Sequence, residues 1–297
     1  MRLGLRLVAT LGAALLVAGS SAVSVSATPE IRRPCKTVGA KAKISGRNVV
    51  CIRTPKGLVW ATQRNSSGSA STVTWQATAD GWQSNGTPLA CPKPLRVPAP
   101  TDLSTATSVL YPGQTRGGNY KPHGGLRFDG NANNAVIVRV PMDGSVMLGA
   151  RYLVDGEVQY TFDIMSPCGI MNRLGHLLVL TPKFQSIANK FPAPTEGDSR
   201  TTFVNPPVKV QAGEVMATQV GVTAKGKNVF FDWGVYDYRS TNAKAADAQW
   251  TAQHKSDFSL AGHALCWLAL LPEPDRARVQ SLPAGDPTSG KSSDYCA

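Results

Sequence analysis

Several features are scarce in this sequence of 297 residues, and each absence narrows the possibilities. After an N-terminal apolar run at Leu7–Val17, no stretch approaches the roughly 20 apolar residues that a membrane-spanning helix needs. There is no CxxC pair, which argues against a zinc cluster, and no GxSxG, which argues against a serine hydrolase of that type. Acidic residues number only 19 against 31 basic ones, giving a net charge of +12. Aromatic and basic residues are rarely interleaved, so we do not expect nucleic acid as a partner. Anionic envelope polymers fit the charge better, although solubility alone would also account for it.

The N-terminus predicts export. Residues 1–6 are short and basic, Leu7–Val17 is apolar, and Val25-Ser26-Ala27 has the small residues of a cleavage site. We therefore expect a signal peptide at residues 1–27 and a secreted or cell-wall-associated mature chain with no membrane span.

Six cysteines in an exported chain favour disulfides. Proximity along the sequence suggests Cys35–Cys51 and Cys266–Cys296, which leaves Cys91 with Cys168. Six cysteines allow 15 connectivities, so the pairing stays open at this stage, and some thiols could instead be free and buried.

Composition divides the mature chain into four segments. Residues 28–64 are basic and hold two cysteines and two short strand patterns, resembling a small two-cysteine module found at the ends of exported proteins of high-GC Gram-positive bacteria. Residues 65–100 are rich in Ser, Gly and Pro and are expected to form a linker with short strands and turns. Residues 101–240 alternate short β patterns with turns, and residues 241–297 predict a short helical appendage that contains Cys266 and Cys296.

The predicted β domain of residues 101–240 has seven candidate strands and one candidate helix. The helix is Lys183–Lys190, in which Phe184, Ile187 and Ala188 share a face. The candidate strands are Ala135–Val140, Ser145–Leu148, Val158–Ile164, His176–Thr181, Val208–Val210, Val215–Val220 and Val229–Trp233.

Two hairpin patterns in this domain share one design, VIVRVPMDGSV and VKVQAGEVMATQVG, each a strand, a glycine turn and a returning strand. The pair resembles the halves of a barrel-sandwich hybrid. Biotinyl and lipoyl carriers use that fold, but neither turn here offers the lysine that a carrier modifies. Together with His123-Gly124-Gly125, the segment LGHL and the segment NVFFDWGV, the hairpins resemble LytM/lysostaphin-type peptidoglycan endopeptidases over residues 120–238. The resemblance implies a mostly β, antiparallel domain.

The same resemblance implies a degraded zinc site. His123 matches a zinc ligand and His176 a histidine that assists catalysis, whereas Arg127 stands where the family has a ligating aspartate. Asn228 and Phe230 stand at two further histidine positions. Guanidinium has no lone pair for a metal, so the resemblance implies a groove that has lost its catalytic metal. We expect Arg127 to take the electrostatic place of the zinc, paired with Asp129, Asp163 or Asp232.

The sequence therefore predicts a pseudo-enzyme of the cell envelope, without metal or cofactor, that binds peptidoglycan or an envelope protein. The groove residues would be His123, Arg127, Asp129, His176, Asn228, Phe230 and Asp232. The alternatives are a zinc hydrolase with a rewired ligand set such as His123, Asp129 and His176, a structural secreted protein, and, more remotely, a thiol enzyme using Cys168 with His123 or His176.

Overall fold

The computed structural model describes residues 33–37, 40–44, 47–54, 57–62, 73–223 and 228–296. The expected signal peptide and the Ser-rich segment at 65–71 lie outside these residues. The chain separates into two compact units, residues 1–69 and 70–297. No helix within the described residues is long and apolar enough to cross a membrane.

The smaller unit is a three-stranded antiparallel sheet in the order β1-β2-β3. Its strands are β1 (Lys41–Ile44), β2 (Arg47–Thr54) and β3 (Gly57–Thr62). The two strands expected from the sequence are present as β2 and β3, and β1 adds to them. The Cys35–Cys51 disulfide ties the chain before β1 to the middle of β2, which supplies a crosslink to a unit too small for a large core.

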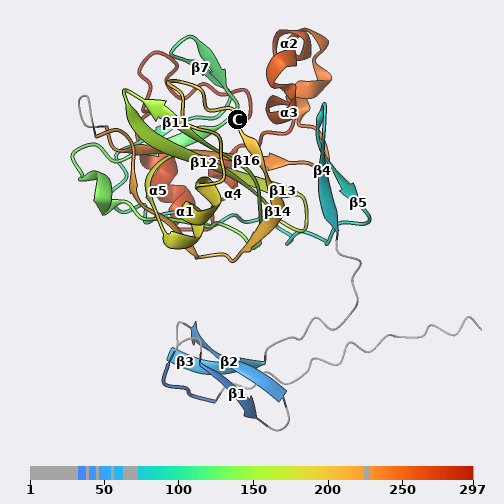
Figure 1. The fold of residues 1–297 in the computed structure, drawn as a ribbon, viewed down its shortest axis with the longest axis vertical. Coiled ribbons are helices and arrows are strands. Elements are labelled where there is room, and N and C mark those ends of the chain that lie inside the picture. Colours follow the sequence, from blue (N-terminus) through green and yellow to red (C-terminus); the bar gives the residue numbers. More distant parts are fainter. Residues whose placement is uncertain are drawn as a thin grey trace, which may run out of the picture. The chain divides into compact units, whose positions relative to one another are not determined.

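The larger unit is mostly β and antiparallel, as the sequence predicts, and Figure 1 shows its strands surrounded by short helices. Its main sheet has the order β14-β11-β12-β13-β16-β9-β6, with β15 attached to β13 and β10 attached to β15. The strands are β6 (Ser108–Leu110), β9 (Gly124–Arg127), β10 (Val138–Arg139), β11 (Gly144–Val154), β12 (Glu157–Met165), β13 (Ile170–Leu180), β14 (Thr202–Val210), β15 (Val215–Val220) and β16 (Phe230–Asp237). Two hairpins stand apart from this sheet, β4 (Thr74–Thr78) with β5 (Gly81–Asn85), and β7 (Gln114–Arg116) with β8 (Asn119–Lys121).

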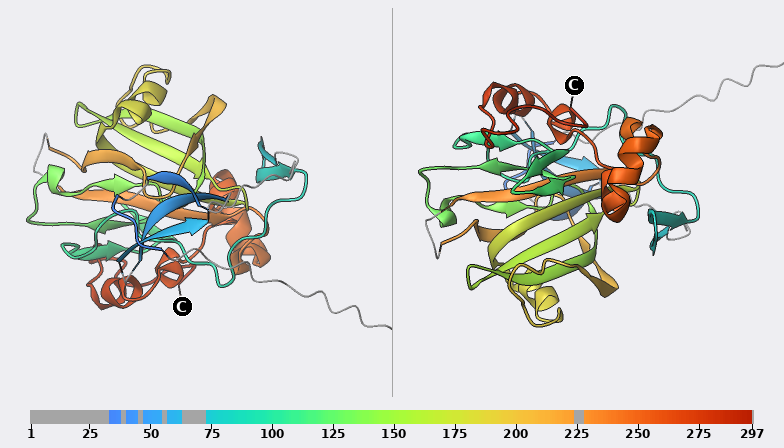
Figure 2. Two further views of the ribbon diagram at one scale, coloured as in Figure 1. Left: turned by 90° about the horizontal axis from the view of Figure 1, so that it is seen from below. Right: turned by 90° about the horizontal axis from the view of Figure 1, so that it is seen from above.

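Short helices cover the sheet on both sides. Helix α1 (Pro182–Ala188) lies on the opposite side of the strands from α4 (Trp267–Leu270) and α5 (Asp275–Ser281) (Figure 2). Phe184, Ile187 and Ala188 are buried on α1, as the shared face predicts. The remaining helical elements are α2 (Ala248–Gln253), α3 (Phe258–Ala261) and the 3-10 turns η1 (Asn133–Ala135), η2 (Ala243–Ala246) and η3 (Lys255–Asp257).

Two segment boundaries differ from those expected. Residues 73–100 are not a free linker, because the Cys91–Cys168 disulfide binds them to the β12–β13 turn and the Val97 N–H donates to the Leu270 carbonyl. Residues 241–297 do not form a separate appendage, since Trp267 and Val279 belong to the main core. In both cases a few large apolar side chains in a polar segment join it to the sheet. The disulfides are Cys35–Cys51, Cys91–Cys168 and Cys266–Cys296, which confirms the pairing that proximity suggests.

One face of the central strands carries polar side chains at one end and apolar side chains at the other. On β12 the residues of this face are Thr161, Asp163 and Met165, because side chains alternate along a strand. Their neighbours on β13 follow the same order, with Asp163 opposite Arg173 and Met165 opposite Met171. The face therefore passes from polar, through an ion pair, to apolar, and each end has its own cavity.

Candidate functional site

Three adjacent strands bring His123, His176 and Asp232 together at the polar end. Strand β16 lies between β13 and β9, and Asp232 is opposite Gly175 on one side and Gly125 on the other. His176 follows Gly175 directly, and His123 comes two residues before Gly125. The strand register thus places one carboxylate between two imidazoles from distant parts of the chain.

The carboxylate of Asp232 contacts both imidazoles through a single oxygen. Its Oδ2 lies 3.1 Å from His123 Nε2 and 3.3 Å from His176 Nε2. The three side chains are only 17–21% exposed. An ionised carboxylate oxygen can accept several hydrogen bonds, so both rings can donate to it at once.

The other nitrogen of His176 defines its protonation. Gln159 Nε2 donates to the Gly221 carbonyl at 2.9 Å, so the Gln159 Oε1 is the acceptor that faces His176 Nδ1 at 2.5 Å. His176 therefore carries a proton on Nδ1. Nε2 faces the second acceptor, the Asp232 carboxylate, so both ring nitrogens of His176 lie against an oxygen.

The ionisation of Asp232 and His123 follows from burial and from their neighbours. Burial would raise the pKa of Asp232, but His123 and His176 outweigh it and hold that pKa well below the ordinary value. For His123, burial lowers the pKa below its ordinary value, with Asp232 opposing and Arg116 and Arg173 adding to the shift. We conclude that Asp232 is anionic and that His123 is a neutral ring donating through Nε2 at neutral pH.

A buried ion pair lies beside this group. Arg173 donates two hydrogen bonds of 2.7 Å to the fully buried Asp163 carboxylate. Burial would lower the pKa of Arg173, but Asp163 outweighs it and raises that pKa. A charge inside each of two otherwise apolar strands, Phe162-Asp163-Ile164 and Asn172-Arg173-Leu174, is the sequence signal that could have revealed this pair.

The cavity around these groups has a volume of about 240 Å³ and polar walls. Tyr152 lies edge-on to His176, with ring centroids 6.1 Å apart, and its hydroxyl accepts from the His176 backbone N–H at 3.3 Å. Burial raises the pKa of Tyr152 to about 12, so its hydroxyl stays protonated. The other polar side chains of the lining, which sequence reasoning missed, are Lys121, Thr161, Arg173 and Ser199.

The two glycines after His123 allow the strands to approach this closely. A Cβ at Gly125 would lie 2.6 Å from the Phe231 carbonyl oxygen and 3.3 Å from Asp232 Oδ1. A Cβ at Gly124 would collide with the Leu110 carbonyl oxygen and the Trp267 indole nitrogen. The His-Gly-Gly segment is thus needed for packing as well as for its histidine.

Arg127 does not supply the positive charge of this cavity. Its guanidinium donates to Asp129 at 2.8 and 3.2 Å, and neither residue lines the cavity. The expectation that Arg127 pairs with one of three aspartates is met by Asp129, but its expected electrostatic role is wrong. Cations that do lie beside the histidines are Arg173 and Lys121 in the cavity wall and Arg116, which donates to the His123 carbonyl at 3.1 Å.

The strand positions expected to face the groove are also shifted. Asn228 forms a bridge with Val222, and its Oδ1 is buried without a hydrogen-bond partner. The Phe230 ring packs on His176, with centroids 4.5 Å apart. Asp232, two residues further on, is the residue of β16 that reaches both histidines, because strand stagger, which sequence spacing does not reveal, sets which residue meets them.

The side chains present do not fit the zinc centre that the resemblance implies. A catalytic zinc needs three protein ligands with free lone pairs. Two of the implied positions hold Arg127 and Phe230, and the expected alternative ligand Asp129 is paired with Arg127. Within the described residues, no group of three or more His, Cys, Asp and Glu side chains has the arrangement of a metal site. The Nε2 atoms of the two histidines face one shared carboxylate oxygen, which is the pattern of a hydrogen-bonded group.

A thiol enzyme is excluded among the described residues, since Cys168 is bonded to Cys91 and no described cysteine is free. Comparison of the chain with protein-family models, with curated proteins and with solved structures finds no match. No family is therefore assigned on that basis.

Proposed function

We propose that this is an exported, non-catalytic cell-envelope protein that binds a small polar part of a cell-wall polymer in the cavity at His123, His176 and Asp232. The observation that carries the proposal is the internal saturation of the charged groups. The Asp232 carboxylate lies against two imidazoles and the Asp163 carboxylate is paired with Arg173, so neither carboxylate is free to act as a base or nucleophile. Hydrolysis would need a group poised to accept a proton or to attack the substrate.

The cavity retains the groups that a binding site needs. The Lys121 ammonium has no hydrogen-bond or ion-pair partner among the described residues, and the Tyr152, Thr161 and Ser199 hydroxyls line the wall. The Lys121 ammonium therefore favours an anionic or hydrogen-bond-accepting group in the ligand. A carboxylate flanked by amides or hydroxyls, as in a peptide stem of peptidoglycan, complements this lining.

The location rests on three features together. The N-terminal pattern predicts export, three disulfides suit an oxidising compartment, and the net charge of +12 favours anionic envelope polymers.

Sedimentation of the full mature chain with purified peptidoglycan at about 150 mM salt tests the proposal, because screening at that ionic strength weakens contacts between exposed charges. We expect retention that falls about tenfold for Lys121→Ala and stays unchanged for Lys190→Ala, a lysine outside the cavity. A full-length Lys41→Glu/Lys43→Glu variant separates attachment by the small basic unit from binding in the cavity. Absence of retention, or loss only in this last variant, would contradict the proposal.

Metal content distinguishes the main alternative. Protein purified without chelator should contain no stoichiometric zinc. Zinc at one equivalent, lost in His123→Ala, would instead support a hydrolase with a rewired ligand set.

A further inference from the structure

The smaller unit carries charge of one sign only. Residues 33–62 hold seven lysines and arginines and no aspartate or glutamate, so these 30 residues supply +7 of the net charge of +12. The other 267 residues hold 24 basic and 19 acidic residues and are much closer to balance. Solubility is served equally well by mixed signs, so the exclusion of acidic residues from this unit points to a partner that carries negative charge.

The cations of this unit are exposed and unpaired. Those whose side chains the structure describes are Arg33, Lys36, Lys41 and Lys43. All four are exposed, and none of their side chains has a hydrogen-bond or ion-pair partner among the described residues. In the larger unit, by contrast, Arg200 and Arg239 each pair with an aspartate two residues earlier.

Strand β1 presents two of these cations on one face of the small sheet. Lys41 and Lys43 are two residues apart on a strand, so their side chains point the same way about 7 Å apart. Ala42, between them, is opposite Val49 and turns to the other face, where Val49 and Cys51 are buried. One face of the unit is thus used for packing, and the other offers a pair of free ammonium groups.

The remaining two cations extend the charge across the sheet. The Trp60 N–H donates to the Arg33 carbonyl at 2.8 Å, so Arg33 lies beside β3, at the edge opposite to β1. Lys36 follows on the connection from that edge to β1, next to the Cys35–Cys51 disulfide. Cations spread in this way fit an extended chain with repeated charges better than a single small anion.

The unit lacks the aromatic surface with which proteins bind single-stranded nucleic acid. Trp60 is the one aromatic residue in the sequence of residues 33–62. It is opposite Cys51, on the face that points away from Lys41. Bases would find no ring to stack on beside these lysines, so a polyanion without bases fits the surface better.

We propose that the smaller unit binds a linear phosphodiester polymer of the glycerol phosphate type through Arg33, Lys36, Lys41 and Lys43. Each repeat of such a polymer carries one negative charge, and its successive phosphates are about as far apart as the two lysines of β1. Lysine and arginine both pair well with phosphate oxygens. This surface is separate from the polar cavity, so its failure would leave the proposed function untouched.

Calorimetry of the full mature chain with a short poly(glycerol phosphate) at several salt concentrations tests this assignment. We expect saturable binding with a Kd on the order of 10 μM at low salt, as for other electrostatic contacts with phosphodiester chains. A plot of log Kd against log salt concentration should have a slope of roughly 3, because four cations neutralise about four phosphates.

Matched variants assign the surface. Lys41→Glu/Lys43→Glu should weaken binding by about tenfold or more and lower the salt slope to about 1–2. Arg33→Gln/Lys36→Gln, which introduces no repulsion, should weaken it by about threefold or more. Lys190→Glu/Lys255→Glu makes the same change in net charge at exposed lysines of the larger unit and should leave both quantities nearly unchanged, as should Lys121→Ala.

Absence of saturable binding would overturn the proposal. So would an equal loss in Lys190→Glu/Lys255→Glu, which would show that the net charge of the chain is responsible and not this surface. Oligo(dT) with the same number of phosphates should bind no more tightly than poly(glycerol phosphate). An affinity for oligo(dT) more than about tenfold higher would assign the surface to nucleic acid instead.

Discussion

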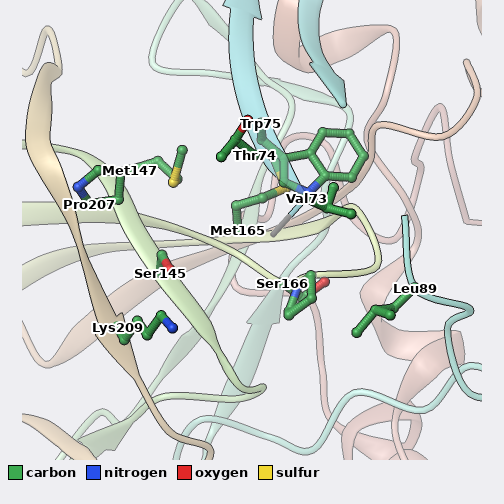
Figure 3. Close-up of a pocket in the computed structure, with 11 residues that line it drawn as sticks. Val73, Thr74, Trp75, Leu89, Ser145, Met147, Met165, Ser166, Pro207 and Lys209 are labelled. Carbon is green, nitrogen blue, oxygen red and sulfur yellow. The ribbon is translucent and has the colours of Figure 1, made fainter. Parts of the chain in front are cut away.

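The two ends of one sheet face differ in whether their buried polar groups have hydrogen-bond partners. At the polar end, His123, His176 and Asp232 satisfy one another, and a half-buried carboxylate is tolerated because two imidazoles surround it. At the apolar end, Met147 and Met165 line a larger cavity of about 440 Å³ (Figure 3), and the indole N–H of Trp75 in its wall is buried without a hydrogen-bond partner. The comparison teaches that a closed hydrogen-bond group indicates a pre-organised polar site, while a buried donor without an acceptor lowers the stability of the region that contains it.

The Asp163–Arg173 ion pair lies between the two ends. Removing one partner should lower the free energy of unfolding more than any other change considered. Arg173→Met leaves the fully buried Asp163 carboxylate unpaired and should lower the free energy of unfolding by about 3–5 kcal/mol. Urea unfolding measures this. The double variant Asp163→Leu/Arg173→Met removes both charges and should be much closer to the wild type. Equal losses in the single and double variants would contradict the role given to the pair.

The Cys91–Cys168 disulfide holds the segment between β5 and the sheet, so its loss should act mainly at the apolar end. Replacing both cysteines by alanine should cost about 2–4 kcal/mol of unfolding free energy. Cys35→Ala/Cys51→Ser lies in the other compact unit and is the matched control, expected to leave the unfolding transition of the larger unit unchanged.

Asp232→Asn tests the polar end through pH. The folded-state pKa values of Asp232 and His123 are both lowered, so each group favours folding less as the pH falls. Wild-type stability should decline as the pH falls below about 6.5, because His123 resists protonation, and again below about 3.8, through Asp232. The variant should lose about 1–3 kcal/mol at pH 7. Its lower decline should be shallower than that of the wild type, although Asp129, whose pKa is also lowered, still contributes to it. A lower decline as steep as that of the wild type would contradict the assignment.

Phe203→Ser should have the smallest effect. Phe203 is an exposed aromatic residue of β14, edge-on to Trp82 with ring centroids 6.2 Å apart. Because the ring stays in water, we expect a loss of about 0.5–1 kcal/mol, measurable as a small shift in urea midpoint. A loss of several kcal/mol would show that the apolar end is more tightly packed than the cavity suggests.

Much of the fold could be predicted from the sequence because alternation and turn residues report directly on strands. The patterns at Val158–Ile164 and Val215–Val220 fall on β12 and β15, and the shared face of Lys183–Lys190 falls on α1. The pattern at Ala135–Val140 was less informative, since only Val138–Arg139 is a strand. A short apolar run without a long partner strand forms few ladder bonds.

The site was harder to predict because it depends on stagger between strands distant in sequence. His123, His176 and Asp232 were all among the expected groove residues, but their mutual contacts follow from pairing of β16 with β13 and β9. Gln159 and Tyr152 carry no local signal of their roles. The short strands expected in residues 65–100 are present as β4 and β5, whose sequence TWQATADGWQ has an Asp-Gly turn between alternating residues. The apolar cavity has no such local signal, because it depends on how this hairpin packs on the sheet.

The glycines that follow His123 also have a consequence for how the sequence can vary. Gly124 and Gly125 exclude a methyl group through backbone neighbours that cannot move aside, whereas Gly130, with a φ of +85°, has open space around it and is constrained by its left-handed conformation alone. Under random substitution, the first two positions should accept no replacement that preserves folding, while Gly130 should accept asparagine or aspartate. Two classes of glycine in one short segment would thus leave different signatures in a saturation-mutagenesis library, one set by space and the other by backbone torsion.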